Sequence, residues 1–296
     1  MVEYVGNGGS LGVVNNIDMV NQNSLTFLRP SRSGGSTQKG GWWAKGRGGN
    51  DFMQVGGSPL AFVSSAGSMT FNSNGFTVAD TSNNNVNARS YLALTFAHVA
   101  GLCAVIDYVG DGSGARAIPH GLGEKPVLAF AFQTSSNRTP YLWGSSMADG
   151  TEMSPAVTAL PTSGSEVVAS SSTVTVATGA NQAGQTYTLV AVKAHADIAV
   201  GSYAGAGASQ KLTLPFQPGV VLMKMTNIAP DHWGYAAYPL EDYSGANDSL
   251  IYLNRVDQFP QDWFDMQPDG IQIKNTFVTS GRNYLYIALS RSAVEP

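Results

Sequence analysis

The fold is decided by one stretch, which reads Ile106-Asp-Tyr-Val-Gly-Asp-Gly-Ser-Gly-Ala-Arg-Ala-Ile-Pro-His-Gly-Leu-Gly-Glu-Lys-Pro-Val-Leu-Ala-Phe-Ala-Phe132. It contains a strand that ends in Tyr-x-Gly-x-Gly, a glycine-rich turn and then an apolar strand. Weaker copies of this arrangement begin at Tyr4 and at Tyr203. A unit that recurs along a chain is the sequence signature of a repeat architecture.

Each copy closes with a second apolar strand that starts with tyrosine. These strands begin at Tyr91, Tyr187 and Tyr284, which are 96 and 97 residues apart. A short alternating strand precedes each of them, at Gly75–Val78, Thr173–Val176 and Gly270–Lys274. Alternation at period two indicates one buried and one solvated face. The turn residues in between predict that each alternating strand forms a hairpin with the tyrosine strand that follows it.

The composition favours strands over helices. Only 12% of the residues are charged, while 34 are glycine and 43% are hydrophobic. We therefore predict an all-β chain of three tandem antiparallel β-sandwich repeats, at residues 1–101, 102–196 and 197–296. The connections between these units are very short, which predicts a stiff rod.

Several classes of partner are not expected from the sequence. The net charge is −4, and no run of Lys and Arg follows a phosphate backbone, so nucleic acid is not a predicted partner. The basic residues between Arg29 and Arg47 are interpreted as a solvated loop surface. The apolar run from Tyr91 to Ile106 is interpreted as two strands, so no membrane insertion is expected. No signal peptide is expected from the first residues, and Cys103 is expected to be a buried, inert thiol.

The N-terminal edge differs from the other two. The second and third units begin with a full strand, whereas the first has only a few residues before its tyrosine. An incompletely paired sheet edge is a template for docking. We therefore predict an assembly edge, completed by another chain or another virion protein, at Val2, Glu3, Tyr4 and Val5.

These residues carry a resemblance to a known class of protein. The order Tyr-x-Gly-x-Gly, Ile-Pro-His-Gly-Leu-Gly-x-x-Pro, apolar strand, Trp and closing Tyr-Leu-Ala-Leu strand resembles the β-sandwich repeat of bacteriophage tail-fibre and related virion proteins. Ile118 to Pro126 matches it best, and the first unit departs from it after Gly8. The resemblance implies a virion location after assembly in the host cytoplasm, other virion proteins as partners, and a homo-oligomer, with a trimer typical of the class.

No cofactor and no metal site are predicted. The four histidines have none of the spacings that zinc sites use. His120 is interpreted as a hydrogen-bonding turn residue, and not as a ligand or a base. Paired acids in the third unit are the candidates for glycoside hydrolysis, but solvated loop acids are far commoner. The acids in question are Glu241, Asp242, Asp257, Asp262 and Asp265.

Aromatic residues of the third unit are the predicted glycan-binding candidates, because aromatic faces suit the apolar faces of sugar rings. Trp263 has no counterpart in the other units and is the best single candidate. The remaining candidates are Trp233, Tyr235, Tyr238 and Tyr243. The competing interpretation is that a tryptophan in every unit belongs to a core or a subunit contact.

Three hypotheses follow, in this order. The first is a non-enzymatic structural component of a virion, in a tail fibre or tail appendage, with a role in host attachment. The second is a receptor binder that recognises a host glycan, and the third is an enzyme that degrades surface polysaccharide. A head fibre or decoration protein is an open alternative to the tail location.

Overall fold

The computed structural model is all-β. The structure describes residues 1–30, 40–45, 51–55, 61–64, 69–79, 84–135, 140–149, 151–154, 161, 164, 166–228, 234–237, 249–252, 258–260 and 263–294. In these segments the non-strand elements are two 3-10 turns, Thr178–Ala180 and Asn275–Val278, and the short helix α1, Arg291–Val294. All strand pairs described are antiparallel, which confirms the prediction of an all-β, antiparallel chain. Nowhere in the described segments does a helix reach the length and apolarity needed to span a membrane.

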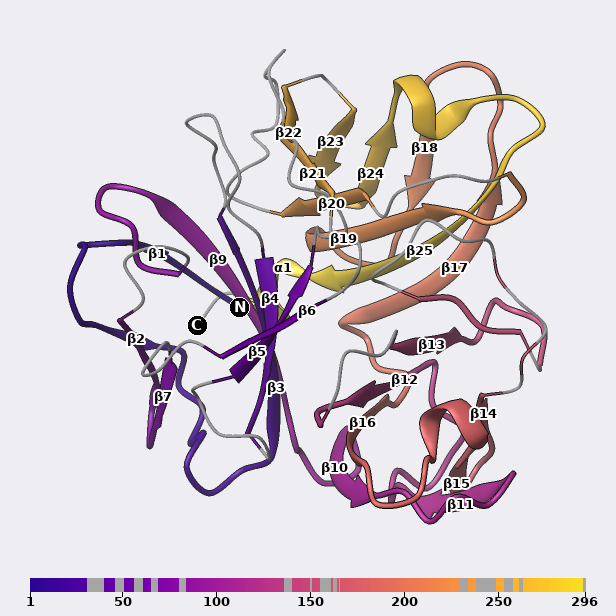
Figure 1. The fold of residues 1–296 in the computed structure, drawn as a ribbon. Helices are drawn as coiled ribbons and strands as arrows, with labels where there is room; N and C mark the ends of the chain where they lie inside the picture. The colour runs from indigo at the N-terminus through magenta and orange to yellow at the C-terminus, as the bar shows by residue number, and fades with distance from the viewer. Residues whose placement is uncertain are drawn as a thin grey trace.

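The strands β1 to β9 form the first lobe, which consists of two sheets (Figure 1). The large sheet has the order β1-β9-β3-β4-β5-β6, with bounds Val2–Val5, Ser90–Ala97, Ser24–Pro30, Gly40–Ala44, Asp51–Val55 and Ala61–Ser64. The small sheet has the order β2-β8-β7, with bounds Leu11–Val14, Gly75–Val78 and Met69–Asn72. Trp43 and Tyr91 from the large sheet share a core with Phe76 from the small one, so the two sheets form a sandwich.

The second lobe, β10 to β16, is built in the same way. Its large sheet has the order β10-β16-β12-β13, with bounds Cys103–Val109, Thr186–Val192, Leu128–Gln133 and Tyr141–Gly144. Its small sheet has the order β11-β15-β14, with bounds Arg116–Pro119, Thr173–Val176 and Val167–Ala169. Trp143 and Tyr187 pack with Ile118 and Val174 between the sheets.

The third lobe, β17 to β25, repeats the large-sheet order of the first. The order is β17-β25-β19-β20-β21-β22, with bounds Ile198–Ala204, Asn283–Ser290, Pro218–Met225, Gly234–Ala237, Ser249–Tyr252 and Gln258–Pro260. The small sheet β18-β24-β23 has bounds Gln210–Thr213, Gly270–Ile273 and Phe264–Gln267. In every lobe the first strand pairs with the last, and the last pairs with the third. The three lobes therefore share this order of strands, whereas the unit boundaries at residues 101 and 196 remain a prediction.

The predicted hairpins are wrong. The alternating strands β8, β15 and β24 each lie in the middle of a small sheet, whereas the tyrosine strands β9, β16 and β25 lie in the large sheets. The turn between them therefore crosses from one sheet of a sandwich to the other. Alternation reports one buried face and does not identify the neighbouring strand.

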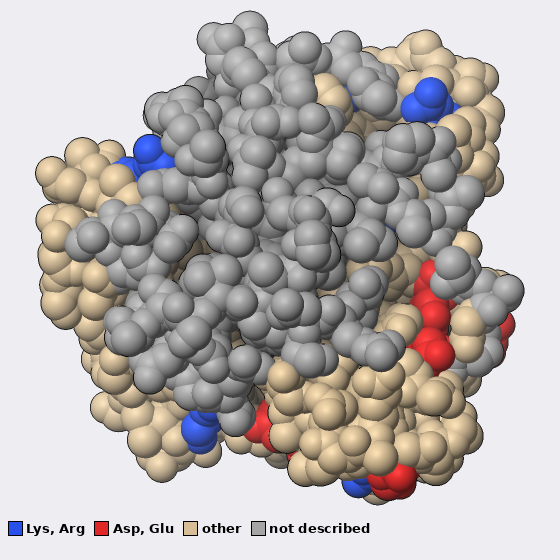
Figure 2. Space-filling view, viewed as in Figure 1, with Lys and Arg blue, Asp and Glu red and all other residues tan. Residues whose placement is uncertain are grey.

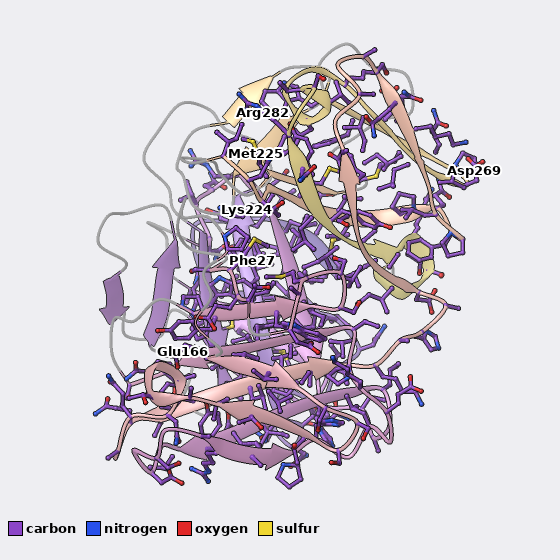
Figure 3. All side chains as sticks on the ribbon, turned by 90° about the vertical axis from the view of Figure 1, so that its right-hand side faces the viewer. Phe27, Glu166, Lys224, Met225, Asp269 and Arg282 are labelled. Carbon is purple, nitrogen blue, oxygen red and sulfur yellow. The ribbon has the colours of Figure 1, made fainter. Side chains whose placement is uncertain are left out.

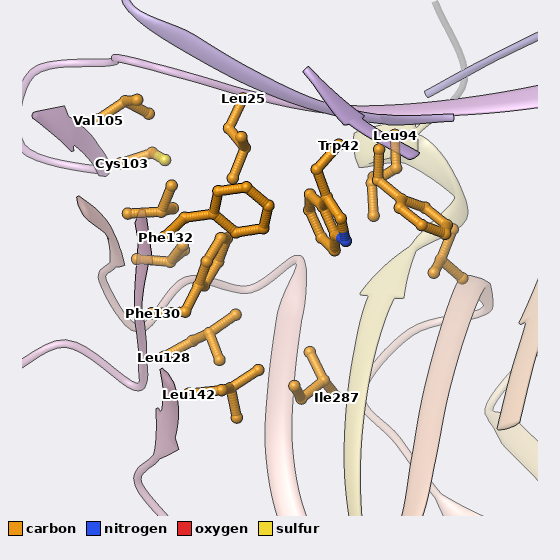
Figure 4. Packing of buried hydrophobic residues seen from close by; sticks show 14 of the residues in the cluster. Leu25, Trp42, Leu94, Cys103, Val105, Leu128, Phe130, Phe132, Leu142 and Ile287 are labelled. Atoms are coloured by element: carbon orange, nitrogen blue, oxygen red, sulfur yellow. The ribbon is translucent and has the colours of Figure 1, made fainter. Parts of the chain in front are cut away.

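A central core joins the three lobes (Figure 4). Leu25 and Trp42 come from the first lobe, Phe130 and Phe132 from the second, and Ile287 from the third, and all belong to one buried cluster. The prediction of a stiff rod is therefore wrong, because lobes arranged end to end would not share one core. Short connections limit how far apart the units lie, but they also permit packing side by side.

The large sheets are covered on both faces, which explains their continuous apolar strands. In β12, Leu128, Phe130 and Phe132 face the central core. Ala129 and Ala131 face the interior of the second sandwich. Large side chains thus fill the interface between lobes, while small ones allow the sheets of one sandwich to approach closely.

Candidate functional site

Trp263, the leading glycan-binding candidate, lies in the core of the third lobe. Its side chain is 6% exposed and meets the ring of Phe277 edge-on, with ring centroids 5.4 Å apart. A ligand platform needs an exposed ring face, so the prediction does not agree with this burial. The backbone of Tyr235 lies in β20, opposite Leu222 and Ile251. The other three candidates, Trp233, Tyr238 and Tyr243, lie outside the described residues.

The acid candidates do not come together as a described pair. The carboxylate of Asp265, in β23, forms an ion pair with the Lys274 ammonium at 2.8 Å, and both side chains are partly buried. Lys274 directly follows β24, so the pair connects β23 to the end of its neighbouring strand and uses the carboxylate structurally. Glu241, Asp242, Asp257 and Asp262 lie outside the described residues.

Sequence reasoning did not identify the pair of acids Glu152 and Glu166 in the second lobe. Glu166 is labelled in Figure 3. Oε2 of Glu152 accepts the Glu166 N–H at 2.6 Å, and Oε2 of Glu166 accepts the Gly179 N–H at 2.6 Å. Burial raises the pKa of Glu152. The hydrogen bond from the Glu166 N–H lowers this pKa, whereas the nearby negative charge of Glu166 raises it further. Both carboxylates hold loop backbone, which is a structural use. The two acids are 14 positions apart in the sequence, and no motif spacing marked them as a pair.

His120 and Cys103 behave as predicted. His120 is buried, and its Nδ1 accepts the Leu122 N–H at 3.1 Å, as expected for a turn residue. Burial raises the pKa of the Cys103 thiol to about 12, so the thiol is inert at neutral pH. Among the described residues, no group of three or more His, Cys, Asp or Glu is placed to hold a metal ion.

The predicted assembly edge is the outer strand of the first large sheet. Val2–Val5 pairs with Ser90–Ala93, so β1 leaves the second half of β9 without a described strand on that side. In the other lobes the equivalent first strands are seven residues long and accompany nearly the whole tyrosine strand. Tyr4 itself is 9% exposed and belongs to the core, so the free part of the edge is backbone beside Leu94–Ala97.

A cleft of about 540 Å³ lies between the second and third lobes. The second lobe contributes Ser146, Met147, Ala148, Thr151 and Pro161. The third lobe contributes Ser202, Tyr203, Ala204, Thr226, Asn283 and Leu285. This volume lies in the range of roughly 300 to 1,000 Å³ that is usual for small-molecule sites.

The inner end of the cleft is closed where the lobes touch. Gly144, the last residue of β13, packs so tightly that an added Cβ would lie 3.0 Å from Cγ1 of Val200 and 3.8 Å from Cδ1 of Leu285. The chain then turns outward through Ser145 to Met147. Glycine at this position lets the second lobe approach β17 and β25 closely, and the cleft opens beyond it.

Among the described residues that line the cleft, none is charged. On the described part of the face in Figure 2, the Lys and Arg side chains also form only small, separate groups. Serine and threonine hydroxyls and the Asn283 carboxamide supply the polar surface of the cleft, and Met147 and Pro161 supply apolar surface. The described lining residues thus offer a neutral polar molecule both hydrogen-bonding groups and apolar surface.

Comparison with known proteins places the chain in a family. Residues 94–293 match the family described as Domain of unknown function (DUF7483). The matched segment begins in β9 and includes every strand of the second and third lobes. No protein with a curated description matches the chain. Because the match spans more than half of its length, the chain belongs to the DUF7483 family.

Proposed function

We propose that this chain is a non-enzymatic structural component of a bacteriophage virion, in a tail fibre or tail appendage, with a role in host attachment. The observation that carries the proposal is the central core, in which Trp42, Phe130 and Ile287 join three β-sandwich lobes. A block built in this way resists deformation, as a particle appendage must, and leaves loops and clefts free for binding. The resemblance of the Tyr-x-Gly-x-Gly repeat to tail-fibre sandwiches supports the same conclusion.

The test is the location of the chain in the particle of the phage that encodes it. We expect mass spectrometry of purified particles to detect the chain, and cryo-microscopy of particles carrying an affinity label on it to place the label on the tail. A label on the capsid would replace the tail assignment with the alternative of a head fibre or decoration protein. Absence of the chain from purified particles would refute the virion role.

We also propose that another virion protein pairs with the open edge of β9. The edge beside Leu94–Ala97 has backbone groups available for a further antiparallel strand. We expect slower amide exchange at Thr95 and Ala97 in the particle than in the isolated chain. Equal exchange rates in both forms would count against this partner site.

A homo-oligomer, with a trimer favoured, remains part of the proposal. The three lobes already surround a common core within a single chain, so a monomer is the competing arrangement. Light scattering on the purified chain distinguishes the two, since the mass of one chain is 31.0 kDa.

Glycan recognition is the second candidate function, and the cleft between the second and third lobes favours it, because its described lining residues are polar or apolar and uncharged. Polysaccharide degradation ranks below it. Hydrolysis requires two available carboxyl groups beside the bond that is cleaved, and among the described acids of the third lobe Asp265 is engaged by Lys274.

A further inference from the structure

We infer that the cleft between the second and third lobes binds an uncharged saccharide. The inference rests on the proposed attachment function, because it names the class of receptor that the attachment site would take. It assigns the site to residues different from the aromatic candidates that the sequence indicated.

The polarity of the cleft follows from the two strands that form its wall. On the central face of β17, Ile198 and Val200 pack against the central core, and Ser202 follows them at the next position of that face. On β25, Ile287 and Leu285 are followed by Asn283 in the same way. Successive residues on one face of a strand are two positions apart, so each strand changes from apolar to polar as it leaves the core.

The cleft therefore has an apolar inner end and a polar outer end. Met147 and Pro161 from the second lobe and Ala204 from the third provide the apolar surface, and the buried Leu285 lies at the inner end. Ser202 and Asn283 are exposed at the outer end, and Ser146 faces them from the second lobe. A pyranose ring has the matching distribution, since its C–H faces are apolar and its rim carries hydroxyl groups.

The polar groups at the outer end are available to a ligand. Within the described residues, the side chains of Ser146, Ser202 and Asn283 make no hydrogen bond to the chain. Two hydroxyls and a carboxamide provide both donors and acceptors, which is what a saccharide hydroxyl needs. Because the described lining residues carry no charge, an acidic sugar would lose hydration there without gaining an ion pair from them.

An extended peptide is the competing class of ligand, because β17 is the edge strand of its sheet. Only Ser202, Tyr203 and Ala204 of β17 line the cleft. A strand pairs over about five or six residues on average, and the contact of the second lobe at Gly144 closes the inner end. A compact ligand fits this short space better than an added strand does.

The experiment is ligand-detected and ¹⁵N-detected NMR on the intact chain. The probes are methyl glycosides of glucose, galactose, mannose and N-acetylglucosamine, together with glucuronic acid and a pool of unstructured peptides. We expect at least one neutral glycoside to bind and to shift the amide signals of Ser202 and Asn283, while glucuronic acid does not.

Two variants locate the binding site. Ala148→Trp places a large side chain at an exposed position of the cleft, and Ala115→Trp makes the same change at an exposed position of the second lobe that does not line it. We expect Ala148→Trp to weaken glycoside binding by at least about tenfold, a change of about 1.4 kcal/mol, and Ala115→Trp to leave it unchanged. The double variant Ser202→Ala/Asn283→Ala should weaken binding as well, while Ser171→Ala, at another exposed serine of the second lobe, should not.

The inference is overturned if no neutral glycoside binds, if binding survives Ala148→Trp in a chain that keeps its native spectrum, or if only the peptides bind. Its failure is separate from that of the proposed function. A chain found on the particle that binds no glycoside refutes the saccharide site alone. A chain that binds glycoside but is absent from purified particles refutes the virion role alone.

Discussion

The rings of Tyr108 and Tyr187 are stacked, with their centroids 5.0 Å apart and their planes at 13°. The pair joins the first and last strands of the second lobe, where the two residues lie opposite each other. Equivalent stacks occur at Tyr4 with Tyr91 and at Tyr203 with Tyr284. The tyrosine that opens each Tyr-x-Gly-x-Gly motif therefore packs against the tyrosine that begins the closing strand.

We predict that Tyr108→Phe destabilises the chain by about 1 to 2 kcal/mol, because the substitution leaves a buried acceptor without its donor. The Tyr108 hydroxyl donates to the carbonyl oxygen of Ala180 at 2.6 Å in the buried interior, while the ring stack is retained in the variant. Urea unfolding followed by tryptophan fluorescence measures the change. Val109→Ala, at a neighbouring side chain that is 54% exposed, is the control and should change stability little.

The first glycine of the same motif allows a close backbone contact. A Cβ on Gly110 would overlap the carbonyl oxygen of Gln182, whereas a Cβ on Gly114 would meet no atom within 4 Å. We predict that Gly110→Ala costs about 2 to 3 kcal/mol or more, and that Gly114→Ala is close to neutral. Both substitutions restrict the unfolded chain equally, so their difference reports the contact alone. Equal midpoints of thermal unfolding for the two variants would contradict this account.

The sequence predicted the parts of the fold that local patterns determine. Strands at Thr173–Val176 and at the apolar run after Pro126 follow from alternation and from β-branched residues, and the structure contains both. The arrangement of the lobes was not predictable in this way. Trp42 and Trp43 are adjacent, yet Trp42 faces the central core and Trp43 the first sandwich, because neighbouring residues of a strand point to opposite faces.

The residues that line the cleft were not predicted from the sequence. Sequence reasoning favoured exposed aromatic residues, and Trp263 proved to be part of a core. The cleft combines Ser146 with Asn283, which lie in different lobes. Residues so far apart in the chain come together through the packing of lobes, and no motif spacing records that packing. The one signal of the cleft in the sequence was the change from apolar Leu285 to polar Asn283, two positions apart on the same face of β25, where the apolar face of the strand ends.

We predict that the three lobes unfold together, because the central core belongs to all of them. The ring of Trp42, from the first lobe, lies 5.7 Å from that of Phe132 and 6.0 Å from that of Phe130, both in the second lobe. Trp42→Ala should cost about 3 to 5 kcal/mol, as large-to-small core substitutions do. Calorimetry should show one transition at a lower temperature. Separate transitions for the lobes would show that they fold independently. Val20→Ala, at an exposed position, is the control and should leave the transition temperature nearly unchanged.

The buried acid Glu152 should make the chain less stable as the pH rises. Burial raises the pKa of Glu152 in the folded chain above its ordinary value of 4.5, whereas in the unfolded chain the group titrates near 4.5. Below pH 4.5 the Glu152 carboxyl is protonated in both the folded and the unfolded chain, so its ionisation does not lower the free energy of unfolding. As the pH rises through the folded-state pKa, the folded chain must also ionise a buried group, so the unfolded state is favoured.

We therefore predict that Glu152→Gln changes the free energy of unfolding in the stabilising direction more at pH 7 than at pH 4. Urea unfolding at both pH values measures this difference. Asp111→Asn is the matched comparison with the opposite sign. Hydrogen bonds from Ser113 and Asn181 lower the pKa of Asp111 to about 2, so its contribution is present above pH 3.8 and is lost as the pH falls toward 2. Asp111→Asn should thus destabilise the chain at pH 7 and matter less at pH 2. A Glu152→Gln variant with the same effect at both pH values would show that the carboxyl of Glu152 is not held in the buried position described.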